Sequence, residues 1–334
     1  MTQDGLEFYL HALQFHAALR QSRTGAGCTC SPPKESAGGA LEIRPKELEA
    51  AIRNRTISWV QIALVGLASA APLPAAAAEL TPEAVQGYAR YLQLTEERMK
   101  PELLPGGSFL WVDGLPEPQR VEVRARLQRG EVATFRLRTN DPSGGDHTPG
   151  ALIHHWVGTI FIPGASLPQV LALLQDYDHH DEYYKPDVVK SKTVGRTGDN
   201  FKIYYRLKRK KVITVVLDTD YDVHYHTIDA ARAFSESHAT RITEVEHPGE
   251  AGELELPPGN DGGYLWRLDS YWRFADAGHG VYVQCEAVSL TRDIPTGLNW
   301  LIGPFVESIP RESLAFTLES TRDAVLQRNS RAPQ

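Results

Sequence analysis

The composition is that of a chain that folds around a sizeable core. It has 334 residues, of which 42% are hydrophobic and 23% are charged, and this excludes a disordered tail and a disulfide-stabilised miniprotein. The 35 Lys and Arg against 42 Asp and Glu give a formal net charge of −7, so nucleic acid is not an expected partner. The cysteines at positions 28, 30 and 285 provide neither a disulfide framework nor the paired spacing of a zinc site.

The N-terminal region contains a segment typical of protein export. Two arginines precede an apolar run at residues 57–71, and prolines and alanines follow it up to Ala78. The run is shorter than the ~20 residues of a membrane-spanning helix, and the order of features predicts a signal peptide at residues 53–78, cleaved near Ala78. We expect residues 1–52 to be a non-native or disordered extension, because a signal peptide normally begins the chain. The rest is expected to be periplasmic or secreted, with an uncleaved membrane anchor as the alternative.

Residues 79–130 are predicted to form a helical N-terminal segment. Pro82 suits the first position of a helix, and an approximate helical stripe follows through residues 82–99. Residues 101–130 are rich in Pro and Gly near their start and predict a loop and another helix. The stripe consists of Val85, Tyr88, Leu92 and Met99.

From Gly130 the pattern changes to strands. Residues 131–139 and 152–162 are two β-like runs separated by a turn-rich segment, which predicts a hairpin or two neighbouring strands. Ser166 and Gln169 then form a capping box for a short helix. Further on, residues 201–207, 213–225, 234–245, 264–274 and 281–291 alternate between apolar and polar side chains, as antiparallel strands with one covered face do.

The chain closes with a predicted helical region at residues 298–326. Pro304 and Pro310 are expected to divide it into a short apolar helix and a longer one, and residues 329–334 are expected to form a disordered tail. The longer helix carries an apolar stripe of Leu314, Leu318, Thr321 and Val325.

Four segments of the region 131–328 resemble the START-like superfamily, also called the helix-grip or SRPBCC fold, which includes coenzyme Q-binding proteins and polyketide cyclases. The resemblance implies an α+β fold in which a curved antiparallel sheet wraps around a long C-terminal helix. It also implies a hydrophobic cavity between the sheet and that helix. The segments are residues 158–166, 173–189, 271–274 and 300–311.

Aromatic side chains are candidates for the wall of that cavity, since Tyr and Trp combine apolar area with a polar tip; ordinary core packing is the alternative for each. Basic residues are candidates for contact with a lipid head group. Arg206 and Arg273 would make it if they point into the cavity, and an outward orientation is the favoured alternative for both. The run that begins with Lys208 and Arg209 is predicted to be a solvated hairpin turn or, alternatively, a membrane contact. The wall candidates are Trp156, Tyr205, Tyr221, Tyr225, Trp266, Trp272, Phe305 and Phe316.

Two groups of titratable residues are candidates for metal binding or acid–base chemistry. The stretch 176–182 holds four carboxylates and two histidines, but the resemblance puts it at the exit of a helix, where a solvated polar turn is expected. His224 and His226 share a strand face, yet no third ligand is evident. We therefore expect no metal, no cofactor and no catalytic residue.

Three functions remain after these exclusions. The first is an exported START-like protein that binds or carries a lipid, a quinone or a similar apolar molecule, with a membrane surface as a further contact. The second is a cyclase/aromatase-type or dehydratase-type enzyme that acts on a polyketide-like substrate. The third is an interaction module whose interior is filled by its own side chains. No nucleophile motif or phosphate-binding loop supports another class of enzyme.

Overall fold

The computed structural model describes residues 79–139, 147–210, 214–294 and 299–331, and within the chain it groups residues from Ala77 onward into one compact unit. The predicted extension (1–52) and signal peptide (53–78) lie outside the described residues. Across the described ranges, no helix is both long enough and apolar enough to cross a bilayer.

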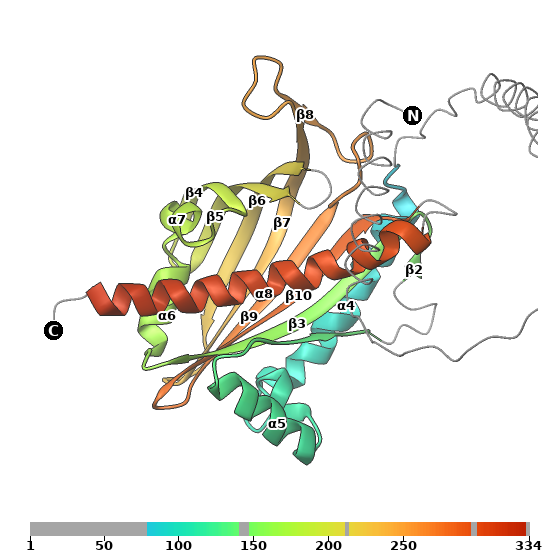
Figure 1. Ribbon diagram of the computed structural model, residues 1–334. Helices are drawn as coiled ribbons and strands as arrows, with labels where there is room; N and C mark the ends of the chain where they lie inside the picture. Colours follow the sequence, from blue (N-terminus) through green and yellow to red (C-terminus); the bar gives the residue numbers. More distant parts are fainter. Residues whose placement is uncertain (1–78, 140–146, 211–213, 295–298, 332–334) are drawn as a thin grey trace, which may run out of the picture. The chain divides into compact units, whose positions relative to one another are not determined.

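The described residues form one curved antiparallel sheet of ten strands (Figure 1). The strand order is β1-β3-β10-β9-β7-β6-β5-β4, with β2 beside β3 and β8 beside β7. The predicted pairing of residues 131–139 with 152–162 is confirmed by β1 and β3. The strands are β1 (Ala133–Arg136), β2 (His147–Thr148), β3 (Ala151–Pro163), β4 (Val188–Thr197), β5 (Asn200–Lys210), β6 (Thr214–Thr227), β7 (Arg232–Glu246), β8 (Leu254–Leu256), β9 (Arg267–Asp276) and β10 (Gly280–Arg292).

A single long helix, α8 (Asn299–Arg331), lies across the concave face of the sheet (Figure 1). The predicted division into two helices was wrong, because α8 runs without a break through Pro304 and Pro310. A proline inside a helix removes one backbone hydrogen bond, and packing of the turns that follow against the sheet offsets that loss. The predicted stripe is confirmed: Leu314, Leu318, Thr321 and Val325 are all buried. The helix also includes residues 329–331, which were expected to belong to a disordered tail.

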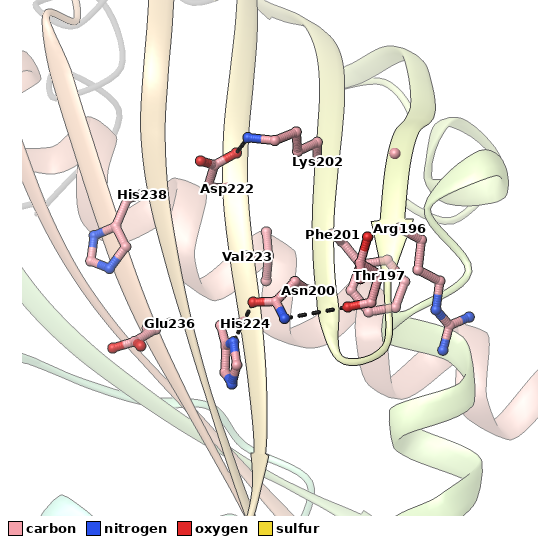
Figure 2. Close-up of a pocket in the computed structure, with 11 residues that line it drawn as sticks. Arg196, Thr197, Asn200, Phe201, Lys202, Asp222, Val223, His224, Glu236 and His238 are labelled. Carbon is pink, nitrogen blue, oxygen red and sulfur yellow. Dashed lines mark hydrogen bonds and ion pairs between the residues drawn. The ribbon is translucent and has the colours of Figure 1, made fainter.

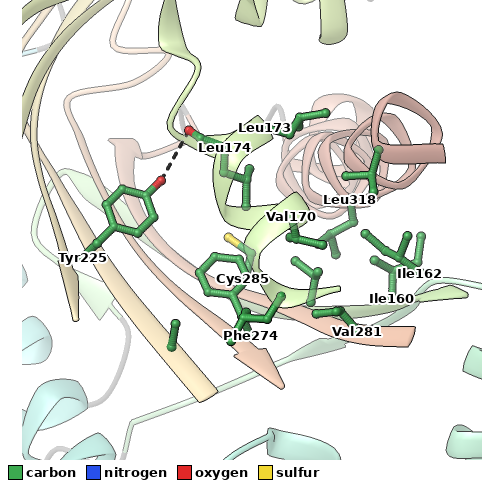
Figure 3. Close-up of a cluster of buried hydrophobic side chains, with 14 of the residues drawn as sticks. Ile160, Ile162, Val170, Leu173, Leu174, Tyr225, Phe274, Val281, Cys285 and Leu318 are labelled. Atoms are coloured by element: carbon green, nitrogen blue, oxygen red, sulfur yellow. Dashed lines mark hydrogen bonds between the residues drawn. The ribbon is translucent and has the colours of Figure 1, made fainter. Parts of the chain in front are cut away.

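Short helices close one end of the space between sheet and helix. They are α6 (Leu167–Leu174), η2 (Tyr177–His179) and α7 (His180–Tyr183). The predicted capping box is present, since the Ser166 backbone N–H donates to Gln169 Oε1 at 2.9 Å. Here α6, α8 and the concave strands enclose a solid apolar cluster (Figure 3), which includes Ile160, Ile162, Val170, Leu173, Leu174, Phe274, Val281, Cys285 and Leu318.

The convex face of the sheet is covered as well, by α4 (Pro82–Leu103), η1 (Trp111–Gly114) and α5 (Glu117–Gln128). Of the predicted stripe on α4, Tyr88 and Met99 are buried, and Val85 and Leu92 are half-buried. The Tyr88 hydroxyl donates to Asp269 Oδ2 at 2.6 Å. The sheet therefore has two partly covered faces, where the alternation had predicted one.

Candidate functional site

The concave face of the sheet is not packed evenly. Close to α6 its side chains are buried, but a row that crosses β3, β10, β9 and β7 is only half-buried. In the strand register Trp156 lies opposite Ala287, Ala287 opposite Ser270, and Ser270 opposite Ser237. Small side chains in the middle of this row leave the surface beneath α8 accessible. We call these four residues the concave row.

Aromatic side chains surround the small residues of the concave row. Trp156, Trp272 and Tyr205 are half-buried at the margin of the apolar cluster, and Tyr221 and Tyr225 are buried within it. These five predicted wall residues therefore share the face beneath α8. Phe316 is half-buried on α8 outside that cluster, and the side chain of Phe305 lies outside the described residues.

Trp266 lies on the other face of the sheet, contrary to the expectation that it lines the cavity. It is 1% exposed and packs with Tyr88 and Tyr91 of α4. Its indole N–H donates to Asp261 Oδ1 at 2.9 Å. The predicted alternating run began three residues too early, at residue 264, because β9 begins at Arg267.

Arg206 and Arg273 also lie on the convex face, so the outward alternative holds for both and neither reaches the space beneath α8. Arg206 pairs with Asp218 at 2.7 Å and Glu253 at 2.8 Å, and the hydrogen bonds that it donates to these carboxylates raise its pKa. The alternation of β5 places Arg206 opposite in direction to its neighbour Tyr205.

Arg273 is completely buried. It donates to the Phe109 carbonyl at 2.8 Å and pairs with Glu102 of α4 at 2.7 Å. Its charge is therefore used to hold the N-terminal segment on the sheet.

Residues 208–210 of the basic run are part of a strand and not of the predicted turn, and residue 211 lies outside the described residues. Lys208 and Arg209 pair with Val216 and Val215 of β6. Lys208 is exposed. Arg209 forms an ion pair with Asp187 and a hydrogen bond with Ser313 of α8, so it ties β5 to the long helix.

Comparison with known proteins gives matches among solved structures only, since no protein-family model and no curated protein matches this chain. A STAR-related lipid transfer protein from Xanthomonas axonopodis is 19% identical, with a TM-score of 0.38 over 57% of this chain and 99% of its own. Human STARD10 is 11% identical, with a TM-score of 0.37 over 65% and 82%. The Zhui aromatase/cyclase from a Streptomyces species is 11% identical, with a TM-score of 0.37 over 53% and 96%. Likenesses at this level carry no argument about function.

The architecture itself is defined by the chain's own topology. A curved antiparallel sheet holds one long C-terminal helix on its concave face, and short helices between β3 and β4 close one end. The chain has the START-like, helix-grip fold. The predicted α+β class and helix-grip arrangement are thereby confirmed.

Within this START-like domain, His180 is a residue that sequence reasoning missed. The segment around it was expected to be a solvated polar turn, and His179 is indeed exposed, but His180 is only 3% exposed. Its ring packs against four tyrosine rings at centroid distances of 4.8 to 6.2 Å. A signal was present: Tyr177, His180 and Tyr184 are three and four positions apart, as on one helical face.

The His180 ring also makes two hydrogen bonds inside the domain. Its Nδ1 lies 2.6 Å from the Tyr205 hydroxyl and its Nε2 lies 3.3 Å from the Leu173 carbonyl. Burial lowers the pKa of His180 to about 4, because a charged imidazolium is poorly solvated there. The ring is therefore neutral near pH 7.

A separate pocket opens on the outer side of β5, β6 and β7 (Figure 2). It encloses about 350 Å³ and is lined mainly by polar side chains, including an ion pair between Lys202 and Asp222 at 2.7 Å. His224 and His226 lie nearby with ring centroids 4.0 Å apart. In the part of the chain that the structure describes, no three His, Cys, Asp or Glu residues gather as a metal site would require. This pocket is separate from the concave row, and we assign it no ligand.

Proposed function

We propose that this chain is an exported START-like protein that binds or carries an apolar or amphipathic small molecule, such as a lipid or a quinone, between its sheet and α8. The observation that carries this proposal is the concave row, in which Ala287, Ser270 and Ser237 keep accessible surface beneath a helix. Large side chains would be expected at these places if the interior were meant to be filled. The flanking indole and phenol rings supply apolar contact area.

The magnitudes favour binding without chemistry. Burying about ten methylene groups contributes roughly 8 kcal/mol, at ~0.8 kcal/mol for each group. Association costs some 4 kcal/mol or more. Useful affinity for an acyl or isoprenoid chain therefore needs no catalytic residue.

A cyclase-type or dehydratase-type enzyme on the same fold is less well supported. Such an enzyme needs an interior group that accepts a proton near neutral pH. Burial lowers the pKa of the interior imidazole of His180 to about 4, so it is a weak base. We therefore favour a binding protein.

Native mass spectrometry of the full chain after exposure to a lipid extract tests binding directly. We expect an additional mass that corresponds to a bound lipid. In the variant Ser237→Leu the larger side chain fills the accessible surface of the concave row, so this mass should be lost. Thr240→Leu, on the same strand but exposed, is the matched control and should keep it. Wild-type protein that never carries a lipid would contradict the proposal.

Export is the second element of the proposal, and it is supported by the order of charged, apolar and small residues at positions 53–78. N-terminal sequencing of the natural protein tests it. We expect the mature chain to begin close to residue 79. A mature chain that retains residues 53–78 would contradict cleavage.

We further propose that the edge strand β4 contacts an anionic membrane surface. Of the seven lysines among the described residues, six lie at positions 185–210, in a chain that is acidic as a whole. Two β-bulges on β4 turn Val189 and Val194 outward, where they are 49% and 62% exposed. Lys190 and Lys192 lie between them and are exposed, without a carboxylate partner in the described part of the chain. Exposed apolar side chains among lysines suit a surface of anionic lipid head groups.

Sedimentation with vesicles tests this contact. Binding is expected to vesicles that contain phosphatidylglycerol, and to weaken in high salt or with phosphatidylcholine alone. Each lysine near such a surface contributes ~1 kcal/mol, so Lys190→Glu with Lys192→Glu should weaken binding by at least about tenfold. Lys100→Glu, in the last turn of α4, is the matched control. Equal binding of both variants would overturn this contact.

A further inference from the structure

The hydrogen bonds of His180 determine which of its ring nitrogens carries the proton. The Leu173 carbonyl can only accept, so Nε2, at 3.3 Å from it, must be the protonated nitrogen. Nδ1 is then unprotonated and accepts the hydrogen bond from the Tyr205 hydroxyl at 2.6 Å. The proton of Tyr205 is therefore used inside the protein.

The other interior hydroxyl groups also donate their protons to acceptors inside the protein. Tyr177 donates to the Tyr225 hydroxyl at 2.8 Å, because Tyr225 donates to the Leu174 carbonyl at 3.3 Å (Figure 3). A second chain runs from Tyr184 to Thr321 at 3.0 Å and from Thr321 to the Thr317 carbonyl at 2.8 Å. Each chain ends at a backbone carbonyl of a helix. The donor capacity of these hydroxyls is thus consumed, and acceptor lone pairs remain.

Tyr205 is the member of this set whose side chain keeps accessible surface. Tyr177, Tyr184 and Tyr225 are 5%, 6% and 7% exposed, whereas Tyr205 is half-buried and lies on the face that carries the concave row. Among the described residues its hydroxyl has His180 as its side-chain hydrogen-bond partner. Its oxygen therefore keeps a lone pair free.

We infer that the Tyr205 oxygen accepts a hydrogen bond from a hydroxyl group of the ligand, so that the preferred ligand is an apolar molecule with an alcohol or phenol at its inner end. This inference rests on the proposed function and adds the chemical class of the ligand. A carbonyl would place two acceptors against each other. A carboxylate or phosphate would do the same with a full charge, and Arg206 and Arg273, the cations expected there, are paired with carboxylates on the other face.

The neutral state of His180 supports the assignment of the Tyr205 oxygen as an acceptor for the ligand. With its pKa lowered to about 4 by burial, the imidazole keeps its Nδ1 lone pair at neutral pH and continues to accept from Tyr205. If Nδ1 were protonated, it would donate to the Tyr205 oxygen, and the Tyr205 O–H would then be free to donate to the ligand.

Competition between two matched probes tests the inference. Dodecanol and its methyl ether share one apolar chain, but only the alcohol donates a hydrogen bond. Each is titrated against a fluorescent apolar dye, N-phenylnaphthylamine, bound to the full chain. We expect wild-type protein to prefer the alcohol by about fivefold, which corresponds to one hydrogen bond of roughly 1 kcal/mol.

Tyr205→Phe should reduce this preference to nearly equal binding while the ether still displaces the dye. Tyr204→Phe, one residue away on the opposite face and bonded to Asp218 at 2.6 Å, is the control and should keep the preference. Equal displacement by both probes in the wild type, or a preference that survives in Tyr205→Phe, would overturn the inference and leave the proposed function intact. No displacement by either probe would overturn both.

Discussion

Gly158 lies where α8 comes closest to β3. A methyl group built on it would lie 2.7 Å from Leu318 Cδ1 and 3.0 Å from Leu314 Cγ, both within the packed stripe of the helix. We predict that Gly158→Val lowers the free energy of unfolding by about 1–3 kcal/mol through overpacking, measured by urea denaturation. Gly252→Ala, with open space around it, is the control. An unchanged urea midpoint for Gly158→Val would show that the helix does not press on the sheet here.

His180 gives the domain a defined pH dependence. Its pKa is about 4 in the folded state and about 6.5 in an unfolded chain, so the unfolded state binds the proton more readily below pH 6.5. Stability is therefore lost as the pH falls from 6.5 toward 4, by about 2 kcal/mol between pH 7 and pH 5. Urea denaturation at both pH values should show a smaller loss for His180→Asn than for the wild type. Identical losses would contradict a buried neutral imidazole.

For single residues, the alternation along a strand predicts which side chains share a face of the sheet, but not which face lies beneath α8. Alternation placed Tyr205 and Arg206 on opposite sides of β5 correctly, yet it left open which of them lies beneath α8. The same holds for Arg273, whose charge is compensated by Glu102 of α4, a residue 171 positions away that no local pattern connects to it.

Among the elements, α4 is held on the convex face by buried polar contacts as well as by apolar ones. The Tyr88 hydroxyl donates to Asp269 at 2.6 Å and lies 2.8 Å from the Val288 carbonyl. Burial and the neighbouring Asp269 raise its pKa well above the ordinary value. Tyr88→Phe should therefore cost about 1–3 kcal/mol, measured by chemical denaturation, and should speed amide exchange in α4. Exchange as slow as in the wild type would show that α4 is held by other contacts.

Elements with strong local signals were predictable, and those set by distant packing were not. The capping box of α6 and the stripe of α8 depend on residues a few positions apart. Pro304 and Pro310 are equally local signals, but they misled, because contacts between α8 and the sheet outweigh two missing hydrogen bonds. The turn expected at Lys208 became strand because β6 supplies a pairing partner for it.

For the molecule as a whole, the order of strands and helices sufficed to predict the helix-grip arrangement. It did not predict that a second layer of helices, α4 and α5, covers the convex face. That layer explains why large aromatic residues occur on both faces of β3 and β9, and why Trp266 was assigned to the wrong side. Because helices cover both faces, most side chains at the centre of the sheet are buried, and the concave row differs from them in being half-buried.

The central claim is that the ligand lies between the sheet and α8, so its location is the most direct test. Quenching of tryptophan fluorescence by a brominated fatty alcohol measures it, because quenching requires close contact, and Trp156 and Trp272 lie on the opposite face of the sheet from Trp266. We expect quenching in the wild type and in Trp266→Phe, and the loss of most of it in Trp156→Phe with Trp272→Phe. Quenching that survives the double substitution undiminished, or that disappears in Trp266→Phe, would contradict a ligand held between the sheet and α8.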